Sequence, residues 1–328
     1  MLLSVAVLNI ACDHHQKPVT NEPKQETKNI VIPQFNADSA FQFVKAQTDF
    51  GPRVPNSEAH KQCAAWLIET MNKFADTVYV QEFRTRLYTG QGIDGKNIIA
   101  SFNPEAKKRI VLCSHWDSRP FADHDEEANW NTPIDGANDG ASGVGVLMEN
   151  ARCFHQTPLN STIGVDIIFF DLEDYGPRQD QSLQYYDDRR NHWALGSQFW
   201  AAQPHLLGYR ANFGILLDMI GGENPNFMKE YYSQGYAAWL SNKVWRIAQD
   251  LGYRQNFVNE LGDPISDDHL PMNEIAGIPT IDIIDLHPNS SNGSFPETWH
   301  TLNDNIEHID KNSLEMVGAV LNQLIYTE

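Results

Sequence analysis

The apolar residues of this chain gather in short runs that end abruptly in polar or turn residues. Such runs are typical of strands buried in a parallel sheet, while strict alternation is typical of a half-buried strand. Val78–Phe83 alternates and is predicted to be a strand of the second kind. The buried strands are predicted at Asn97–Phe102, Ile110–Ser114, Val165–Asp171, Phe213–Asp218 and Thr280–Asp285.

Helical spacing of apolar positions separates most of these strands. The predicted helices are Asp38–Thr48, Ser57–Phe74, Gly143–Phe154, Leu195–Ala202, Ala237–Leu251 and Ser313–Tyr326. Alternating strands and helices indicate an α/β fold, with a mainly parallel, mixed sheet covered by helices on both faces. No internal repeat or second boundary is visible, so residues 37–328 are predicted to form a single domain.

The first 36 residues differ from the rest in composition. Residues 1–12, MLLSVAVLNIAC, form a short apolar stretch that ends at Cys12 and resembles a bacterial lipoprotein export signal. Residues 13–36 are polar and read as a flexible tether. We therefore expect an exported protein, either periplasmic or anchored to a membrane by a lipid on Cys12. A plain export signal without lipidation and a misassigned start of the chain are the alternatives.

Charge and cysteine content limit the classes of partner and of metal site that this chain could have. The chain has 43 Asp and Glu against 24 Lys and Arg, a formal net charge of −19. This balance argues against nucleic acid as a partner, because there is no cationic surplus to displace counterions. Beyond Cys12, the cysteines Cys63, Cys113 and Cys153 have no zinc-finger spacing. A metal in this protein would therefore depend on histidines and carboxylates.

The most informative segment is IIFFDLED, in which a buried strand ends in Asp171, Glu173 and Asp174. Open α/β sheets bind ligands at the carboxyl ends of their strands. Adjacent carboxylates there repel one another and lose hydration, and a bound cation offsets both costs. The segment therefore predicts a metal site with a spare carboxylate beside it.

Further polar residues occupy equivalent places after other predicted strands. A lone Asp or His at such a place is usually a cap or a hydrogen-bonded surface group. Capping alone does not explain a whole set at one edge of the sheet, so we expect these residues to converge. The set is His115 and Asp117 in SHWDSR, Asp139 in GANDGASG, Asp218 in GILLD and His300 in FPETWHT.

Two long loops, Arg119–Ala137 and Tyr175–His192, interrupt the regular order. Long loops in compact domains are often functional, and the second loop is predicted to be a wall or lid of the site. The charged run HDEE that begins at His124 is expected to be solvated. Trp193 is expected to be a packing residue.

The motifs HWD, GANDGASG, FFDLED, LLDMIG and WHT together resemble the zinc aminopeptidase superfamily. The resemblance extends from about residue 38 to about residue 325. The segments ILLDMIGGENPNF, PISDDHLP and FPETWHTLNDN resemble the glutaminyl cyclase branch more closely. This resemblance implies a zinc enzyme that acts on peptide or protein N-termini, and a monomer is expected.

Carried onto this sequence, the resemblance implies that Asp139, Asp174 and His300 bind one Zn²⁺. Two carboxylates and one imidazole leave a fourth position for water or substrate, as catalytic zinc requires. Glu173 matches the general acid/base of the family.

The resemblance also assigns the surroundings of Glu173. Asp218 and Asp267 match acids that hydrogen-bond around it and raise its pKa by repulsion. Trp299 and Phe295 match the aromatic contacts of the substrate pocket.

These assignments imply cyclisation of an N-terminal Gln to pyroglutamate with release of ammonia. The first alternative is a dizinc aminopeptidase, in which His115, Asp139 and Asp218 hold a second ion and Asp117 lies at or behind that ion. The second alternative is a non-catalytic exported binding protein on the same scaffold.

Overall fold

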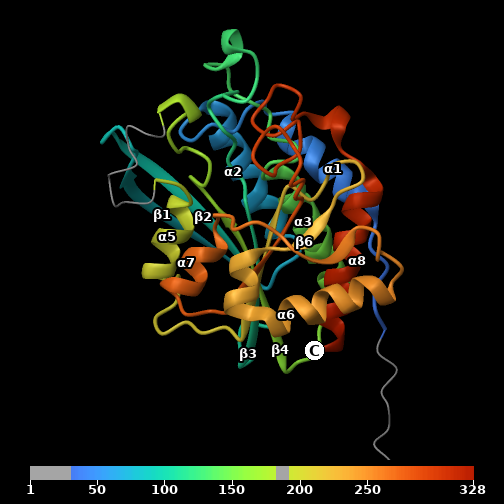
Figure 1. Ribbon diagram of the computed structural model, residues 1–328. Helices are drawn as coiled ribbons and strands as arrows, with labels where there is room; N and C mark the ends of the chain where they lie inside the picture. Colours follow the sequence, from blue (N-terminus) through green and yellow to red (C-terminus); the bar gives the residue numbers. More distant parts are fainter. Residues whose placement is uncertain (1–30, 182–191) are drawn as a thin grey trace, which may run out of the picture. The chain divides into compact units, whose positions relative to one another are not determined.

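The computed structural model describes residues 31–181 and 192–328 (Figure 1). The predicted export signal, the tether as far as residue 30 and part of the second long loop lie outside the described residues. The ordered domain begins earlier than residue 37, because Phe35 is only 4% exposed and packs in the main core. Its ring occupies the space above Gly318, where a Cβ atom would lie 2.1 Å from the Phe35 ring.

A six-stranded sheet forms the centre of this domain, and its mixed, mainly parallel character confirms the predicted fold class. The strand order is β1-β2-β4-β3-β5-β8, with antiparallel pairing of β1 with β2 and of β2 with β4, and parallel pairing of the others. The strands are β1 (Thr77–Arg86), β2 (Gly92–Phe102), β3 (Lys108–His115), β4 (Ile163–Phe170), β5 (Phe213–Asp218) and β8 (Thr280–Ile284).

Helices cover both faces of the sheet (Figure 1). Along β3, Ile110 and Leu112 face the larger core, whereas Val111 and Cys113 face the smaller one, as the two-residue period of a strand requires. The larger core is made with α1 (Ala37–Thr48), α2 (Glu58–Met71), α3 (Ala141–Gln156), α6 (Tyr231–Asp250) and α8 (Lys311–Thr327). The smaller core is made with α5 (Leu195–Ala202) and α7 (His269–Glu274).

Three elements were not predicted from the sequence. β6 (Phe227–Lys229) and β7 (Phe257–Leu261) form a separate parallel pair, and α7 is the third. These segments are too short to establish a hydrophobic period of their own. No helix in the described part of the chain is long and apolar enough to cross a membrane.

Candidate functional site

The polar residues that the sequence places after different strands meet at one edge of the sheet. Within the described residues, two groups each bring three ligand atoms within 4.8 Å of one another. One group is Asp139, Asp174 and His300, and the other is His115, Asp139 and Asp218. Every member is buried. Asp139, in the turn before α3, belongs to both groups.

The group of Asp139, Asp174 and His300 has the donors that zinc prefers. His300 Nε2 lies 3.3 Å from Asp174 Oδ1 and 3.6 Å from Asp139 Oδ2. Asp174 Oδ2 is buried without a hydrogen-bond partner, as expected for an oxygen that coordinates a metal ion. These three residues therefore suit a Zn²⁺ ion.

A second layer of polar residues orients this group. His300 Nδ1 lies 3.4 Å from Asp123 Oδ1, which leaves Nε2 directed at the two carboxylates. Arg119 donates from Nε and Nη2 to Asp123, at 2.7 Å each, and from Nη1 to Asp174 Oδ1, at 3.2 Å. Carboxylate–histidine pairs of this kind fix the orientation of metal-binding imidazoles.

The second group is arranged differently. His115 Nε2 lies 3.0 Å from Asp139 Oδ1 and 3.3 Å from Asp218 Oδ1. Burial would lower the pKa of His115, but hydrogen bonds to Asp117, Asp139 and Asp218 raise it well above its usual range. His115 Nε2 therefore faces two carboxylates at ion-pair distance, and the same three side chains could hold a second metal ion.

Asp117 lies behind both groups and holds the end of β4. Its Oδ1 accepts from Glu173 N and its Oδ2 from Asp174 N, each at 3.2 Å. The chain reverses just before, at Leu172, which has a φ of 58°. This turn and the two amide bonds let Glu173 and Asp174 take separate places in the site.

Glu173 is not a member of either group of candidate metal ligands. Its carboxylate makes no hydrogen bond within the described residues. Burial and then the repulsion of Asp267 raise its pKa well above the usual range, although His115 opposes this. Burial likewise raises the pKa of Asp218 to about 7. A carboxyl with a raised pKa beside a metal site is suited to proton transfer.

The glycine-rich turn that carries Asp139 is held by its backbone. Asp304 accepts from Asn138 N at 2.7 Å and from Asp139 N at 3.1 Å. Gly140, with a φ of 86°, allows His115 to approach, since a Cβ atom there would lie 2.7 Å from His115 Cε1.

A cavity of about 320 Å³ opens onto these groups. Asp139, Glu173, Asp174 and His300 form its polar end. Its remaining walls include aromatic and apolar side chains, among them Trp193, Ile265, Phe295 and Trp299. The Trp299 ring stacks on His300, with 3.7 Å between the ring centroids.

Residues 97–325 match the model of peptidase family M28. The chain belongs to peptidase family M28. Within this family it is similar to a glutaminyl cyclase of Bacteroides thetaiotaomicron, solved with N-acetylhistamine, at 49% identity and a TM-score of 0.85, over 91% of this chain and 100% of the other. It is also similar to a Zn-dependent exopeptidase of Parabacteroides distasonis, at 46% identity and a TM-score of 0.87, with the same shares covered.

A more distant relative is the glutaminyl-peptide cyclotransferase of Bothrops jararaca. It is 28% identical over 288 residues, which cover 80% of this chain and 70% of that protein. M28 proteins thus include both cyclases and exopeptidases on one scaffold. The relatives and solved structures named as glutaminyl cyclases support the cyclase reading of this M28 chain.

Two residues of this M28 chain lie at the site cavity or its edge although the sequence did not place them there. Trp193 lines the cavity, where its ring lies 4.8 Å from the Arg119 guanidinium, and so does more than fill space in the core. Glu126 and Glu127 of the HDEE run are exposed, as expected, whereas His124 is half-buried, packs on Trp299 at 4.3 Å between centroids, and its burial lowers its pKa to about 4. His124 lies within the first long loop, and Trp193 directly follows the second.

Sequence analysis did not identify Arg119, Asp123 or Asp304 as part of the site. Each acts on the candidate site through another residue rather than as a ligand. The four-residue spacing of Arg119 and Asp123 is the one feature of the sequence that could have marked them, and in the structure their ion pair is buried.

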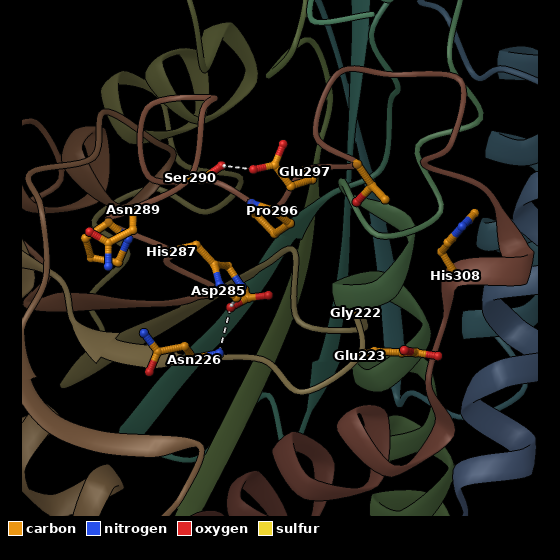
Figure 2. Close-up of a pocket in the computed structure, with 12 residues that line it drawn as sticks. Gly222, Glu223, Asn226, Asp285, His287, Asn289, Ser290, Pro296, Glu297 and His308 are labelled. Carbon is orange, nitrogen blue, oxygen red and sulfur yellow. Dashed lines mark hydrogen bonds and ion pairs between the residues drawn. The ribbon is translucent and has the colours of Figure 1, made fainter.

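The site cavity is not the largest hollow of the domain. A cavity of about 600 Å³ lies beside it, with Asp285, His287 and His308 in its wall (Figure 2). Pro296, Glu297 and Thr298 line this larger cavity, whereas the flanking Phe295 and Trp299 line the site cavity. The larger cavity contains neither candidate metal group nor Glu173, so its size is no guide to the chemistry.

Proposed function

We propose that this M28 chain is a zinc-dependent glutaminyl-peptide cyclotransferase that converts the N-terminal Gln of peptides to pyroglutamate and releases ammonia. The observation that carries the proposal is the placing of Glu173. It is a carboxylate with a raised pKa, outside the metal groups, at the polar end of a small aromatic cavity.

We assign Asp139, Asp174 and His300 as the ligands of the zinc ion. Their donor types, their burial and the support from Asp123 and Arg119 favour this group. When bound, the ion would polarise the γ-carbonyl of the substrate Gln.

The reaction joins the α-amino nitrogen to the γ-carbonyl carbon of the same residue, and the bond from that carbon to the side-chain nitrogen breaks. In this scheme, Glu173 accepts a proton from the attacking amine and delivers it to the departing nitrogen, which leaves as ammonia. Because the attack is intramolecular, the protein mainly has to hold the folded-back conformer. Trp299, Phe295 and Trp193 line a cavity small enough to do so.

Asp267 and Asp218 complete the acidic surroundings of Glu173. Asp267 is the charged neighbour with the greatest effect on the pKa of Glu173. A pKa raised toward the working pH makes the return of the proton to the leaving nitrogen easier. Asp267 and Asp218 are therefore assigned as acids that tune Glu173.

A dizinc aminopeptidase is the second candidate, and one observation favours it. Asp139 presents Oδ1 to His115 and Oδ2 to His300, so one carboxylate could bridge two ions. We favour one zinc at the first group because Asp123 and Arg119 support its ligands from behind.

Parallel assays with a Gln-initiated and a Leu-initiated peptide separate the two functions. A cyclase lowers the mass of the first peptide by about 17 Da, through loss of ammonia, and leaves the second peptide intact. Release of free Leu without any loss of ammonia would establish the peptidase instead.

Export, with a lipid on Cys12, completes the proposal, and its support is the resemblance of residues 1–12 to a lipoprotein signal. We expect the mature protein to be a monomer that meets its peptide substrates outside the cytoplasm. Metabolic labelling with a fatty acid tests the anchor. We expect label in the wild type and none in Cys12→Ala. An unlabelled wild type would contradict the lipid anchor on Cys12.

A further inference from the structure

Glu230 immediately precedes α6 and is fully buried. It caps the helix, because Oε1 accepts from Tyr232 N at 2.8 Å and Oε2 accepts from Ser233 N at 2.6 Å. A cap of this kind satisfies amides that have no partner within the helix. Capping alone explains only part of what this side chain contacts.

The same carboxylate also contacts a different segment of the chain. Its Oε1 accepts from Ile265 N at 3.0 Å, and its Oε2 lies 3.3 Å from His269 Nε2. Ile265 is two residues before Asp267, and His269 is two residues after it. Glu230 thus holds the backbone on one side of Asp267 and a side chain on the other side.

The segment that Glu230 holds is a wall of the site cavity. Pro264, Ile265, Ser266 and Asp267 line this cavity. Asp267 and Glu173 line the same cavity, and Asp267 Oδ1 accepts from the next amide, Asp268 N, at 2.5 Å. The place of the Asp267 carboxylate therefore follows the backbone that Glu230 anchors.

We propose that Glu230 is a positioning residue for the cyclisation: its carboxylate ties the 264–268 segment to the start of α6 and so sets where Asp267 lies against Glu173. This inference depends on the proposed function, because Asp267 has its role only in that reaction. Although burial opposes it, hydrogen bonds from His269 and the helix amides hold the pKa of Glu230 below its usual value. The group therefore stays an ionised acceptor, which strengthens all four contacts.

The decisive variant is Glu230→Asp. Asp is a favoured N-cap residue, but its side chain is one methylene shorter and would lose its reach to Ile265 and His269. We expect kcat to fall on the order of 10-fold to 100-fold, with KM within about twofold, because small misplacements of catalytic groups cost this much. Zinc content is expected to remain that of the wild type.

The matched control is Asp310→Ala. Asp310 caps α8 in the same manner, through a bond from Asn312 N at 3.0 Å, and does not line the cavity. We expect it to lower Tm without changing kcat. A comparable loss of kcat in this control would mean that helix capping, rather than positioning, explains the result, and would overturn the proposal.

A double-mutant cycle with Asp267→Asn distinguishes positioning from a general structural role. It compares the effect of Glu230→Asp on kcat in the wild type with its effect in the Asp267→Asn variant. If Glu230 acts through Asp267, Glu230→Asp changes kcat by less than about twofold in the Asp267→Asn background. Effects that multiply would overturn the proposal. Glu230→Gln, which keeps the chain length, serves in the same cycle where Glu230→Asp does not fold.

Amide hydrogen exchange separates this inference from the proposed function. In Glu230→Asp, the amides of residues 264–268 are expected to exchange faster, while those of Tyr232 and Ser233 stay protected. Unchanged exchange in the loop overturns the positioning role even in an active enzyme. An inactive wild type with the expected exchange pattern overturns the proposed function and leaves the contacts of Glu230 intact.

Discussion

The two metal-competent groups share Asp139 and are equally buried, yet their surroundings differ. Around His300, Asp123 contacts the distal imidazole nitrogen and Arg119 contacts Asp174, so both ligands are held from behind. Around His115, the distal nitrogen lies 3.5 Å from Asp117 Oδ1, an oxygen that already accepts from Glu173 N. The first group is built to keep an imidazole oriented toward a cation.

This difference bears on the choice between one-zinc and two-zinc chemistry. Ligand types alone leave the two equal, since each group has one histidine and two aspartates. The second layer does not, because Arg119 forms an ion pair with Asp174, whereas within the described residues no Arg or Lys forms one with Asp139 or Asp218. We therefore favour the first group as the zinc site.

The largest expected effect follows from removing a ligand that belongs only to the supported group. His300→Ala is expected to abolish zinc binding and to lower turnover by more than about 10⁴-fold, because the Lewis acid and its template are lost together. Metal analysis of the purified protein and ammonia release provide the check. Full zinc content in this variant would mean that the other group holds the ion.

Glu173→Gln separates proton transfer from metal binding. Turnover is expected to fall about 10³-fold while zinc stays bound, since Gln keeps the shape but cannot accept the proton. Turnover equal to that of the wild type would show that Glu173 has no part in the mechanism. It would favour the hypothesis of a non-catalytic binding protein.

His115→Gln tests the other group directly. The one-zinc account predicts an unchanged zinc content and a loss of activity of about tenfold, because His115 only organises Asp139 and Asp218 by hydrogen bonds. A fall from two zinc ions to one in the same preparation would favour the aminopeptidase arrangement.

Asp267→Asn is expected to move the acid limb of the kcat/KM profile to lower pH. Burial and then Asp267 raise the pKa of Glu173, so removing the Asp267 charge lowers that pKa and keeps Glu173 ionised further into the acid range. The pH profiles of the variant and the wild type, measured side by side, decide this. An acid limb that moves to higher pH would show that repulsion is not what Asp267 contributes.

The smallest effect concerns the stability of the chelated protein. Asp218 and Asp304 have pKa values of about 7 in the folded chain, well above the ordinary value of 3.8. Between these values the folded state binds more protons than the unfolded state, so stability rises as the pH falls from about 7 toward 5. Thermal unfolding in chelator measures this, and a shallower dependence is expected for Asp218→Asn.

The sequence predicted the central strands well because their apolar runs are bounded by polar residues on both sides. Phe213–Asp218 was predicted to the residue. β6 and β7 were missed because each is stabilised by its partner from a distant segment, and neither has a distinctive pattern of its own. The start of the domain was placed a few residues late because the contacts of residues 33–36, among them the burial of Phe35, are with distant parts of the chain and leave no local pattern.

For the site, the sequence predicted that histidines and carboxylates would converge at one edge of the sheet. In the structure, they form two groups whose ligand atoms lie within 4.8 Å of one another. Their roles as ligands and acids stay predictions. What the sequence did not indicate depends on loop conformation. His300 has a φ of 55° and Leu172 one of 58°, a backbone region that neither residue favours and that no local pattern indicates. The ion pair of Arg119 with Asp123 depends on the same kind of tertiary detail.

A zinc titration of the chelated wild-type protein, followed by ammonia release from a Gln-initiated peptide, tests the central claim most directly. The account predicts that activity rises linearly and stops at one zinc ion per chain. Activity that continues to rise to two ions per chain, or zinc uptake without any ammonia release, would contradict it.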